Sequence, residues 1–388
     1  MRPMRSTRRV TAAVVLGLLV CLSGVNSRAQ EQALVWARFE QYLDALRRQA
    51  GIPGLSGVIL KDRQVVWQAG FGLADVAGNV PATPDTPFHV AGLTQALSTV
   101  LLLQCAEQGL VDLDAPLRAY VPAAADPEGA ATLRQLLMHT AEPAADGGPA
   151  PFRYDLAHLA VLTPVIEGCL KVPFREALAH GLLDVAGLAA SVPGHDMEDP
   201  ATLAQLSLEA FDEVTRARYL EILGRLATPY AVDGAGRPTP SDYPARSLDA
   251  GGGLVTTAAD LARFDVALTP WVDETEVQRW LLLSPATLQA AWTAPGSSAG
   301  TAIGPSAVPT GRQPHGLGWF VQDYQGQRVV WQFGVVPSAS SSIVIKVPDR
   351  QLTLVLLANS DGLVAPFGLE AGDVTTSVFA QLFLRLFL

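Results

Sequence analysis

The residues that could carry chemistry in this chain are defined first by the spacings that are missing. A serine nucleophile is often activated by a lysine one helical turn later, in the pattern Ser-x-x-Lys. The 388-residue chain has three lysines, Lys61, Lys171 and Lys346, and none of them follows a serine or threonine at that spacing. The histidines show no His-Glu-x-x-His spacing and the cysteines no Cys-x-x-Cys, so we expect neither a metal site nor a cofactor.

One segment has the surroundings of a serine nucleophile but lacks the serine. It opens an apolar helical stretch at residues 92–109 and reads Phe88-His89-Val90-Ala91-Gly92-Leu93-Thr94-Gln95. It resembles the nucleophile segment of the serine β-lactamase and penicillin-binding protein family, in the branch related to class C β-lactamases, which reads roughly F-x-I-A-S-x-T-K. Gly92 stands at the serine position and Gln95 at the lysine position.

The two other motifs of that family are also altered. Its Tyr-x-Asn motif aligns with a segment in which Tyr154 is kept and Leu156 replaces the asparagine. Its Lys-Thr-Gly or His-x-Gly strand motif aligns with a segment in which Gln332 replaces the cation or imidazole and Gly334 is kept. We expect Gly334 to let a ligand lie along the strand edge, and the N–H of Val335 to act as a second oxyanion donor beside that of Gly92.

The resemblance extends over residues 34–360. Further segments match in order, at residues 52–54, 70–75, 83–88, 107–114, 120–122, 132–140, 248–254 and 256–264. It implies an α+β fold, in which an antiparallel sheet is flanked by the N- and C-terminal helices and carries an inserted, mostly helical domain.

Periodicity along the chain agrees with this organisation. Helical spacing at residues 33–50 and 369–388 places a helix near each end. Strand patterns cluster near both ends as well, at residues 56–60, 64–69, 318–324, 328–333, 340–347 and 352–358. We therefore predict a sheet domain from residues 30–90 plus 311–388, and a helical domain from residues 91–310 inserted into it.

The substitutions remove the family's covalent chemistry. Gly92 has no atom that could attack a carbonyl, and the amide of Gln95 neither carries charge nor titrates usefully. Leu156 and Gln332 lack the groups that orient a substrate. We therefore predict a catalytically inactive protein with a binding or scaffolding role, which takes a small peptide, ester or carboxylate non-covalently at Gly92, Tyr154, Gln332, Gly334 and Val335.

The alternative is an active esterase, β-lactamase or D-Ala-D-Ala peptidase with a displaced nucleophile. Ser338, Ser340, Ser341 and Ser342 lie close to the third motif, but no basic residue is beside them in the sequence. A Gly-x-Ser-x-Gly pattern at residues 296–300 lies in a Pro/Gly/Ala-rich loop, without the strand and helix that a nucleophile elbow needs. His139 is expected to cap or hydrogen-bond a helix end.

The N-terminus has the pattern of an export signal. Residues 1–29 combine a basic start with four arginines, an apolar run and the small-x-small cleavage site Ser27-Arg28-Ala29, so we expect export to the periplasm or beyond in a bacterium, with the membrane contacted only by this segment. Its removal changes the net charge from −10 to −15, which excludes a nucleic-acid binder. Cys105 and Cys169 then remain; buried free thiols are the simpler interpretation and a disulfide the alternative.

Overall fold

The computed structural model describes residues 33–142, 150–244, 248–295 and 314–388. The expected signal segment at residues 1–29 and the Gly-x-Ser-x-Gly pattern at residues 296–300 lie outside these ranges. Among the described residues, no single helix is long and apolar enough to cross a membrane. The helices at Ala157–Leu170 and Phe174–Leu183 pass that test only as a pair, bent by 77°.

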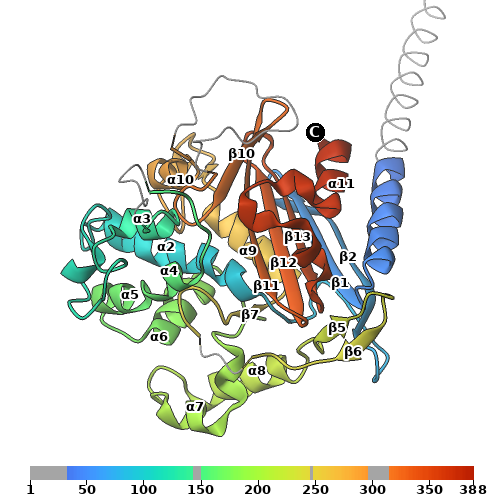
Figure 1. Cartoon of the computed structure of the whole chain (residues 1–388), viewed down its shortest axis with the longest axis horizontal. Helices are drawn as coiled ribbons and strands as arrows, with labels where there is room; N and C mark the ends of the chain where they lie inside the picture. Colours follow the sequence, from blue (N-terminus) through green and yellow to red (C-terminus); the bar gives the residue numbers. More distant parts are fainter. Residues whose placement is uncertain (1–32, 143–149, 245–247, 296–313) are drawn as a thin grey trace, which may run out of the picture.

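The centre of the fold is a seven-stranded antiparallel sheet built from both ends of the chain (Figure 1). The strands occur in the spatial order β10 (Phe320–Tyr324), β11 (Gln327–Val336), β12 (Ser340–Val347), β13 (Leu352–Ala358), β1 (Gly54–Lys61), β2 (Gln64–Asp75) and β3 (Val80–Pro81). The N-terminal strand β1 pairs with the C-terminal strand β13, with Val58 opposite Val355. This α+β arrangement confirms the fold expected from the sequence.

Alternating side chains give the sheet two buried faces. Leu354 and Leu356 face a core that also contains Phe39 of the helix at residues 33–49 and Phe383 of α11 (Val378–Phe387). Their neighbours Val355 and Leu357 belong to the opposite core, together with the buried residues of α2 (Thr94–Glu107) and α9 (Ala258–Leu268). The period of two along a strand therefore produces a three-layer molecule, helix on sheet on helix.

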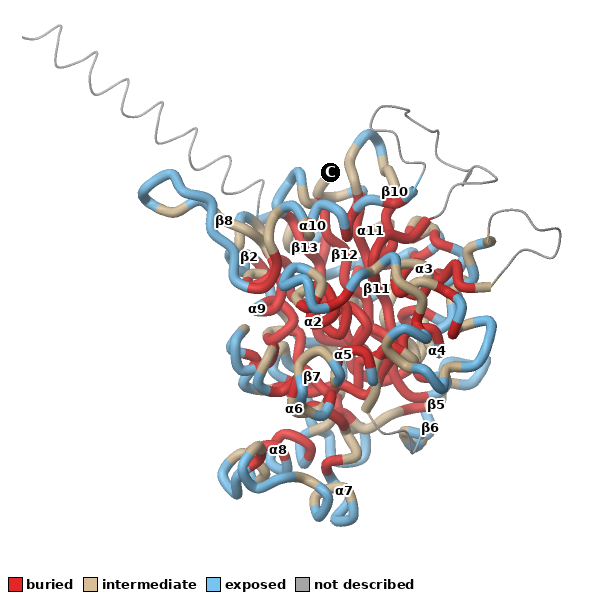
Figure 2. The backbone as a smooth tube through the Cα atoms, turned by 90° about the vertical axis from the view of Figure 1, so that its left-hand side faces the viewer, coloured by how far each residue is buried: buried red, intermediate tan, exposed pale blue. Residues whose placement is uncertain are grey.

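The region between the two groups of strands is rich in short helices and loops. Its helices are α3 (Leu133–Leu137), α4 (Ala157–Ala160), α5 (Thr163–Leu170), α6 (Phe174–Leu178), α7 (Pro200–Gln205), α8 (Glu213–Leu223) and α10 (Pro285–Ala291). Three small ribbons complete it: β4 (Phe88–His89) with β7 (Val255–Thr256), β5 (Tyr230–Val232) with β6 (Pro238–Pro240), and β8 (Trp271–Val272) with β9 (Gln278–Arg279). Burial is concentrated in the sheet and the helices against it, whereas α7 has no buried residue and α8 buries only Tyr219, Ile222 and Leu223 (Figure 2).

The C-terminal helix begins later than its periodicity predicts. The chain takes left-handed backbone conformations at Gly368 and Gly372, with φ of 58° and 89°, and these interrupt the helical pattern. Ser377 then caps α11 by accepting a hydrogen bond from the N–H of Ala380. The apolar side chains of this segment face the sheet, as Phe379 and Phe383 are buried in the core.

Cys105 of α2 and Cys169 of α5 form a disulfide, with their Cα atoms 6.3 Å apart. The interpretation of these residues as free thiols is therefore wrong. Sequence alone could not decide between the two, because the cysteines are 64 positions apart and meet only through the packing of α2 against α5.

Removal of this disulfide is expected to lower the free energy of unfolding by about 2–4 kcal/mol, because the bridge restricts the unfolded chain. The measurement is urea unfolding with and without dithiothreitol. A Cys105→Ala/Cys169→Ala variant should match the reduced protein and ignore the reductant. An unchanged unfolding midpoint on reduction would contradict the prediction.

Candidate functional site: the tip of helix α2

The Gly92 segment is held at the start of α2 by a dense set of hydrogen bonds. It forms a single 3₁₀ turn, η1 (Ala91–Leu93), directly before the helix. Ala91 has a left-handed φ of 51°, which a residue with a side chain adopts only when its surroundings hold it there. The Thr94 hydroxyl donates to the carbonyl of Ala91 at 2.7 Å and accepts from the N–H of Leu254 at 3.2 Å. The turn therefore keeps one fixed geometry.

Leu156 occupies the space above Gly92. A Cβ atom built on Gly92 would lie 2.9 Å from Leu156 Cδ1 and 3.0 Å from Cδ2, closer than real Cβ contacts. Gly251 packs closely against the backbone of Leu156, since an added Cβ at Gly251 would lie 2.7 Å from the carbonyl oxygen of Leu156. The two family positions that should present a nucleophile and a substrate amide partner thus pack against each other.

Gln95 links Tyr154 to His139 inside the protein. Its Nε2 donates to the Tyr154 hydroxyl at 2.7 Å, and its Oε1 lies 3.3 Å from Nε2 of His139. The N–H of Asp155 donates to Nδ1 of His139 at 3.1 Å, so the proton of the neutral ring is on Nε2, where it can donate to Gln95. Gln95 and His139 are fully buried, and burial raises the pKa of Tyr154 well above its ordinary value. This chain of neutral groups stands where the family has a charged lysine.

His139, which directly follows α3 and its C-cap Met138, also packs against other rings. It approaches His315 with ring centroids 4.7 Å apart, and its φ of 54° turns the backbone after α3. Burial, and then the repulsion of His315 and His158, hold the pKa of His139 well below its usual range. Burial lowers the pKa of His315 to about 3. The histidines are recognisable in the sequence, but nothing there indicates that they would meet.

This cluster predicts a loss of stability in mild acid. A histidine whose pKa is depressed by folding binds its proton more readily in the unfolded chain, so unfolding takes up protons below pH 6.5. We expect the free energy of unfolding to fall by about 1.4 kcal/mol per pH unit for each such histidine as the pH drops below 6.5.

Urea unfolding between pH 8 and pH 4.5 measures this slope. His315→Phe should remove about one proton of uptake. The exposed His180 is the control, because folding shifts its pKa in the opposite direction. Hydrogen bonds with Asp184 and the carbonyl of Ala210 raise the pKa of His180, so the stability that it contributes is largest at low pH and is lost as the pH rises. A flat profile down to pH 5 would contradict the prediction.

The residues of the third motif make their contacts with the backbone of the protein itself. Gln332 is buried in β11; its Nε2 donates to the carbonyl of Gly318 at 3.0 Å, and its Oε1 accepts from the N–H of Phe333. A Cβ on Gly334 would lie 2.0 Å from the carbonyl oxygen of Val90 and 2.7 Å from the nitrogen of Leu93. The segment at residues 90–93 therefore packs directly on Gly334, where a side chain would not fit, while Val335, the next residue along β11, is half-buried.

Three of the four serines near the third motif serve the fold, while Ser338 is exposed. Three buried hydroxyls donate to backbone carbonyls: Ser340 to His89, Ser341 to Ser360 and Ser342 to Val90, at 2.6–2.9 Å. Two of these bonds connect β12 to the segment just before Gly92. Among the described residues, no group of three or more His, Cys, Asp or Glu side chains is arranged to hold a metal ion.

Similar proteins of known structure share this architecture. The octameric penicillin-binding protein homologue from Pyrococcus abyssi superposes with a TM-score of 0.67 at 19% identity, covering 90% of this chain and 77% of that one. A class C beta lactamase from Rhodobacter sphaeroides superposes with a TM-score of 0.62 at 16% identity, covering 91% and 99%. At these identities the likeness concerns the fold alone.

Curated proteins are similar over shorter segments. The human mitochondrial serine beta-lactamase-like protein LACTB is 36% identical over 80 residues, which are 21% of this chain and 15% of that protein. Esterase EstB of Burkholderia gladioli is 26% identical over 115 residues, 28% and 29% of the two chains. Each match therefore spans less than a third of the relative's length. The family model described as Beta-lactamase, in contrast, matches residues 39–373, and the chain belongs to that family.

Proposed function

We propose that this protein is a catalytically inactive member of the β-lactamase family that acts by non-covalent binding or as a scaffold in the cell envelope. The observation that carries the proposal is the contact of Leu156 with Gly92. The glycine supplies no nucleophile, and the two methyl groups of Leu156 fill the place where a serine side chain would start. Loss of the nucleophile from a serine hydrolase costs about a millionfold in turnover.

The hydrogen bonds of Gln95 support the same conclusion. A general base at this position must accept a proton, whereas Gln95 uses both ends of its amide in hydrogen bonds to Tyr154 and His139. The depressed pKa of His139 keeps its ring neutral at pH 7, and the raised pKa of Tyr154 keeps its hydroxyl protonated. None of the three groups can take over the role of the missing lysine.

Active-site labelling tests the proposal. The wild-type protein is expected to form no covalent adduct with a fluorescent penicillin or a fluorophosphonate, under conditions that label an active class C β-lactamase completely. Intact-mass measurement gives the readout. An adduct mapped to any serine would overturn the proposal and favour a hydrolase with a displaced nucleophile.

We propose a small peptide, ester or carboxylate as the ligand of this site. We also propose that the protein is exported. The arginine-rich, apolar N-terminal pattern supports export, which N-terminal sequencing of the envelope fraction would check by a start at Gln30. A ligand group in the space where a side chain of residue 92 would start must displace Leu156. Titration with an acyl-dipeptide should therefore give tighter binding to Leu156→Ala than to the wild type, and Gly92→Trp should abolish binding.

A further inference from the structure

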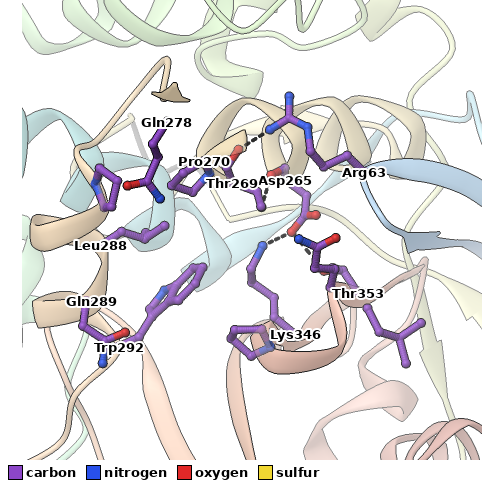
Figure 3. A pocket seen from close by; sticks show the side chains of 14 residues that line it. Arg63, Asp265, Thr269, Pro270, Gln278, Leu288, Gln289, Trp292, Lys346 and Thr353 are labelled. Carbon is purple, nitrogen blue, oxygen red and sulfur yellow. Dashed lines mark hydrogen bonds and ion pairs between the residues drawn. The ribbon is translucent and has the colours of Figure 1, made fainter. Parts of the chain in front are cut away.

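A second site lies apart from the helix tip, at the junction of α9, α10 and the ends of β12 and β13. It is a pocket of about 240 Å³ that none of the family-motif positions lines. One wall is apolar, formed by Pro270, Leu288 and Trp292 (Figure 3). The volume corresponds to about eight water molecules at roughly 30 Å³ each, which suits a ligand the size of benzoate.

The charged groups of this pocket favour an anion. Its lining includes the cations Arg63 and Lys346 and a single carboxylate, Asp265, on a chain whose net charge is −10. Lys346 extends from β12 to Asp265 of α9, with which it forms an ion pair, and the ammonium lies 5.3 Å from the ring centroid of Trp292 (Figure 3). The pocket is therefore a local region of positive charge on an acidic protein.

Two hydrogen-bond donors of the lining, on Lys346 and Trp292, have room for a further acceptor. Oδ1 of Asp265 receives both Lys346 and the Thr353 hydroxyl, the latter at 3.1 Å. The ammonium of Lys346 has three N–H donors, and Asp265 satisfies one of them. The indole Nε1 of Trp292, which is 7% exposed, has no hydrogen-bond partner among the described residues. A buried N–H without an acceptor costs free energy that a ligand oxygen would recover.

Arg63 closes the other side of the pocket. It comes from the turn between β1 and β2, donates to the carbonyl of Thr269, and stacks 4.7 Å from the ring centroid of Trp271. Both contacts hold the guanidinium at the rim of the pocket, where its charge favours an oxygen anion. Burial lowers the pKa of Lys346 to about 7, so most of the amine is protonated at pH 6.5.

We propose that this pocket binds a small carboxylate with an apolar ring or branched chain, whose oxygens reach Lys346 and Trp292 while its apolar part packs on Leu288 and Pro270. The site is independent of the Gly92 turn and of whether that turn is inactive. The carboxylate supplies an acceptor to Lys346 and to Trp292, and the apolar wall excludes fully hydrated inorganic anions.

Benzoate is the probe, and its binding is measured by calorimetry and by the fluorescence of Trp292. The wild-type protein should bind it saturably at pH 6.5 with a Kd of about 1 mM or below, a reasonable limit for so few atoms. Benzamide, of the same shape but neutral, should bind at least tenfold more weakly. No saturable signal up to 20 mM benzoate, or equal binding of benzamide, overturns the proposal.

Two variants locate the binding. Trp292→Phe removes the N–H and keeps an aromatic wall, so it should weaken benzoate at least threefold while the protein stays folded. Lys346→Met should abolish binding, and Lys171→Met, the same change at an exposed lysine, should not alter it. Unchanged affinity in both pocket variants would place the benzoate elsewhere and overturn the proposal. If Lys346→Met does not fold, Trp292→Phe and Arg63→Gln decide.

Discussion

The triple variant Gly92→Ser/Gln95→Lys/Leu156→Asn is expected to acquire acylation by a fluorescent penicillin, at a rate at least about a thousandfold above that of the wild type. The serine restores the nucleophile, the lysine the base, and the asparagine both opens the space above position 92 and returns an amide that can orient a substrate. The fixed η1 turn would then present the hydroxyl at the tip of α2, where backbone N–H groups can stabilise the oxyanion.

The double variant Gly92→Ser/Gln95→Lys is the matched control. With Leu156 kept, its methyl groups compete with the new side chain for the same space, so we expect labelling to remain at the wild-type level. Equal labelling of the double and triple variants would show that Leu156 does not exclude the substrate. Labelling of the wild type itself would remove the basis of the proposed function.

Asp265→Ala is expected to lower the free energy of unfolding by about 3–5 kcal/mol, because it leaves the ammonium of Lys346 buried without a counter-charge. Both side chains are nearly inaccessible, at 4% and 9% exposure, and Thr353 loses an acceptor in the same variant. The cost should be largest below pH 7. At higher pH the amine of Lys346, whose pKa burial lowers to about 7, can stay neutral in the fold.

Urea unfolding at pH 6 and pH 8.5 measures both the cost and its pH dependence. The double variant Asp265→Leu/Lys346→Met removes both charges and should recover most of the lost stability. Asp114→Ala breaks an exposed ion pair with Arg134 and should barely move the unfolding midpoint. If Asp265→Ala unfolds like Asp114→Ala, the buried pair does not stabilise the fold.

The site around Gly92 differs from a family site that has lost only its serine. Loss of the serine alone would leave an open cleft with an intact set of binding groups. Here Leu156 covers Gly92, and the η1 turn packs against Gly334. The side chain of Gln332 forms hydrogen bonds with the backbone groups of Gly318 and Phe333. These contacts crowd the space at Gly92, so a single reversion is not expected to restore chemistry.

The sequence by itself determined the family, the sheet built from both chain ends, and the resemblance by which Gly92 and Gln95 align with the family's serine and lysine. These follow from residue types at fixed local spacings and from alternation along strands, which neighbouring residues are enough to specify. The identity of Leu156 was equally plain, but its position over Gly92 was not. No local pattern states how the two segments approach each other.

Only the tertiary structure decided the contacts between distant segments. Gln95 meets Tyr154 across 59 positions and His139 across 44, and Lys346 meets Asp265 across 81. The Cys105–Cys169 bridge and the pocket at Lys346 arise in the same way. Their physical reason is shared: burial drives these segments together, and the polar groups enclosed there must then find partners among whatever the packing places within reach.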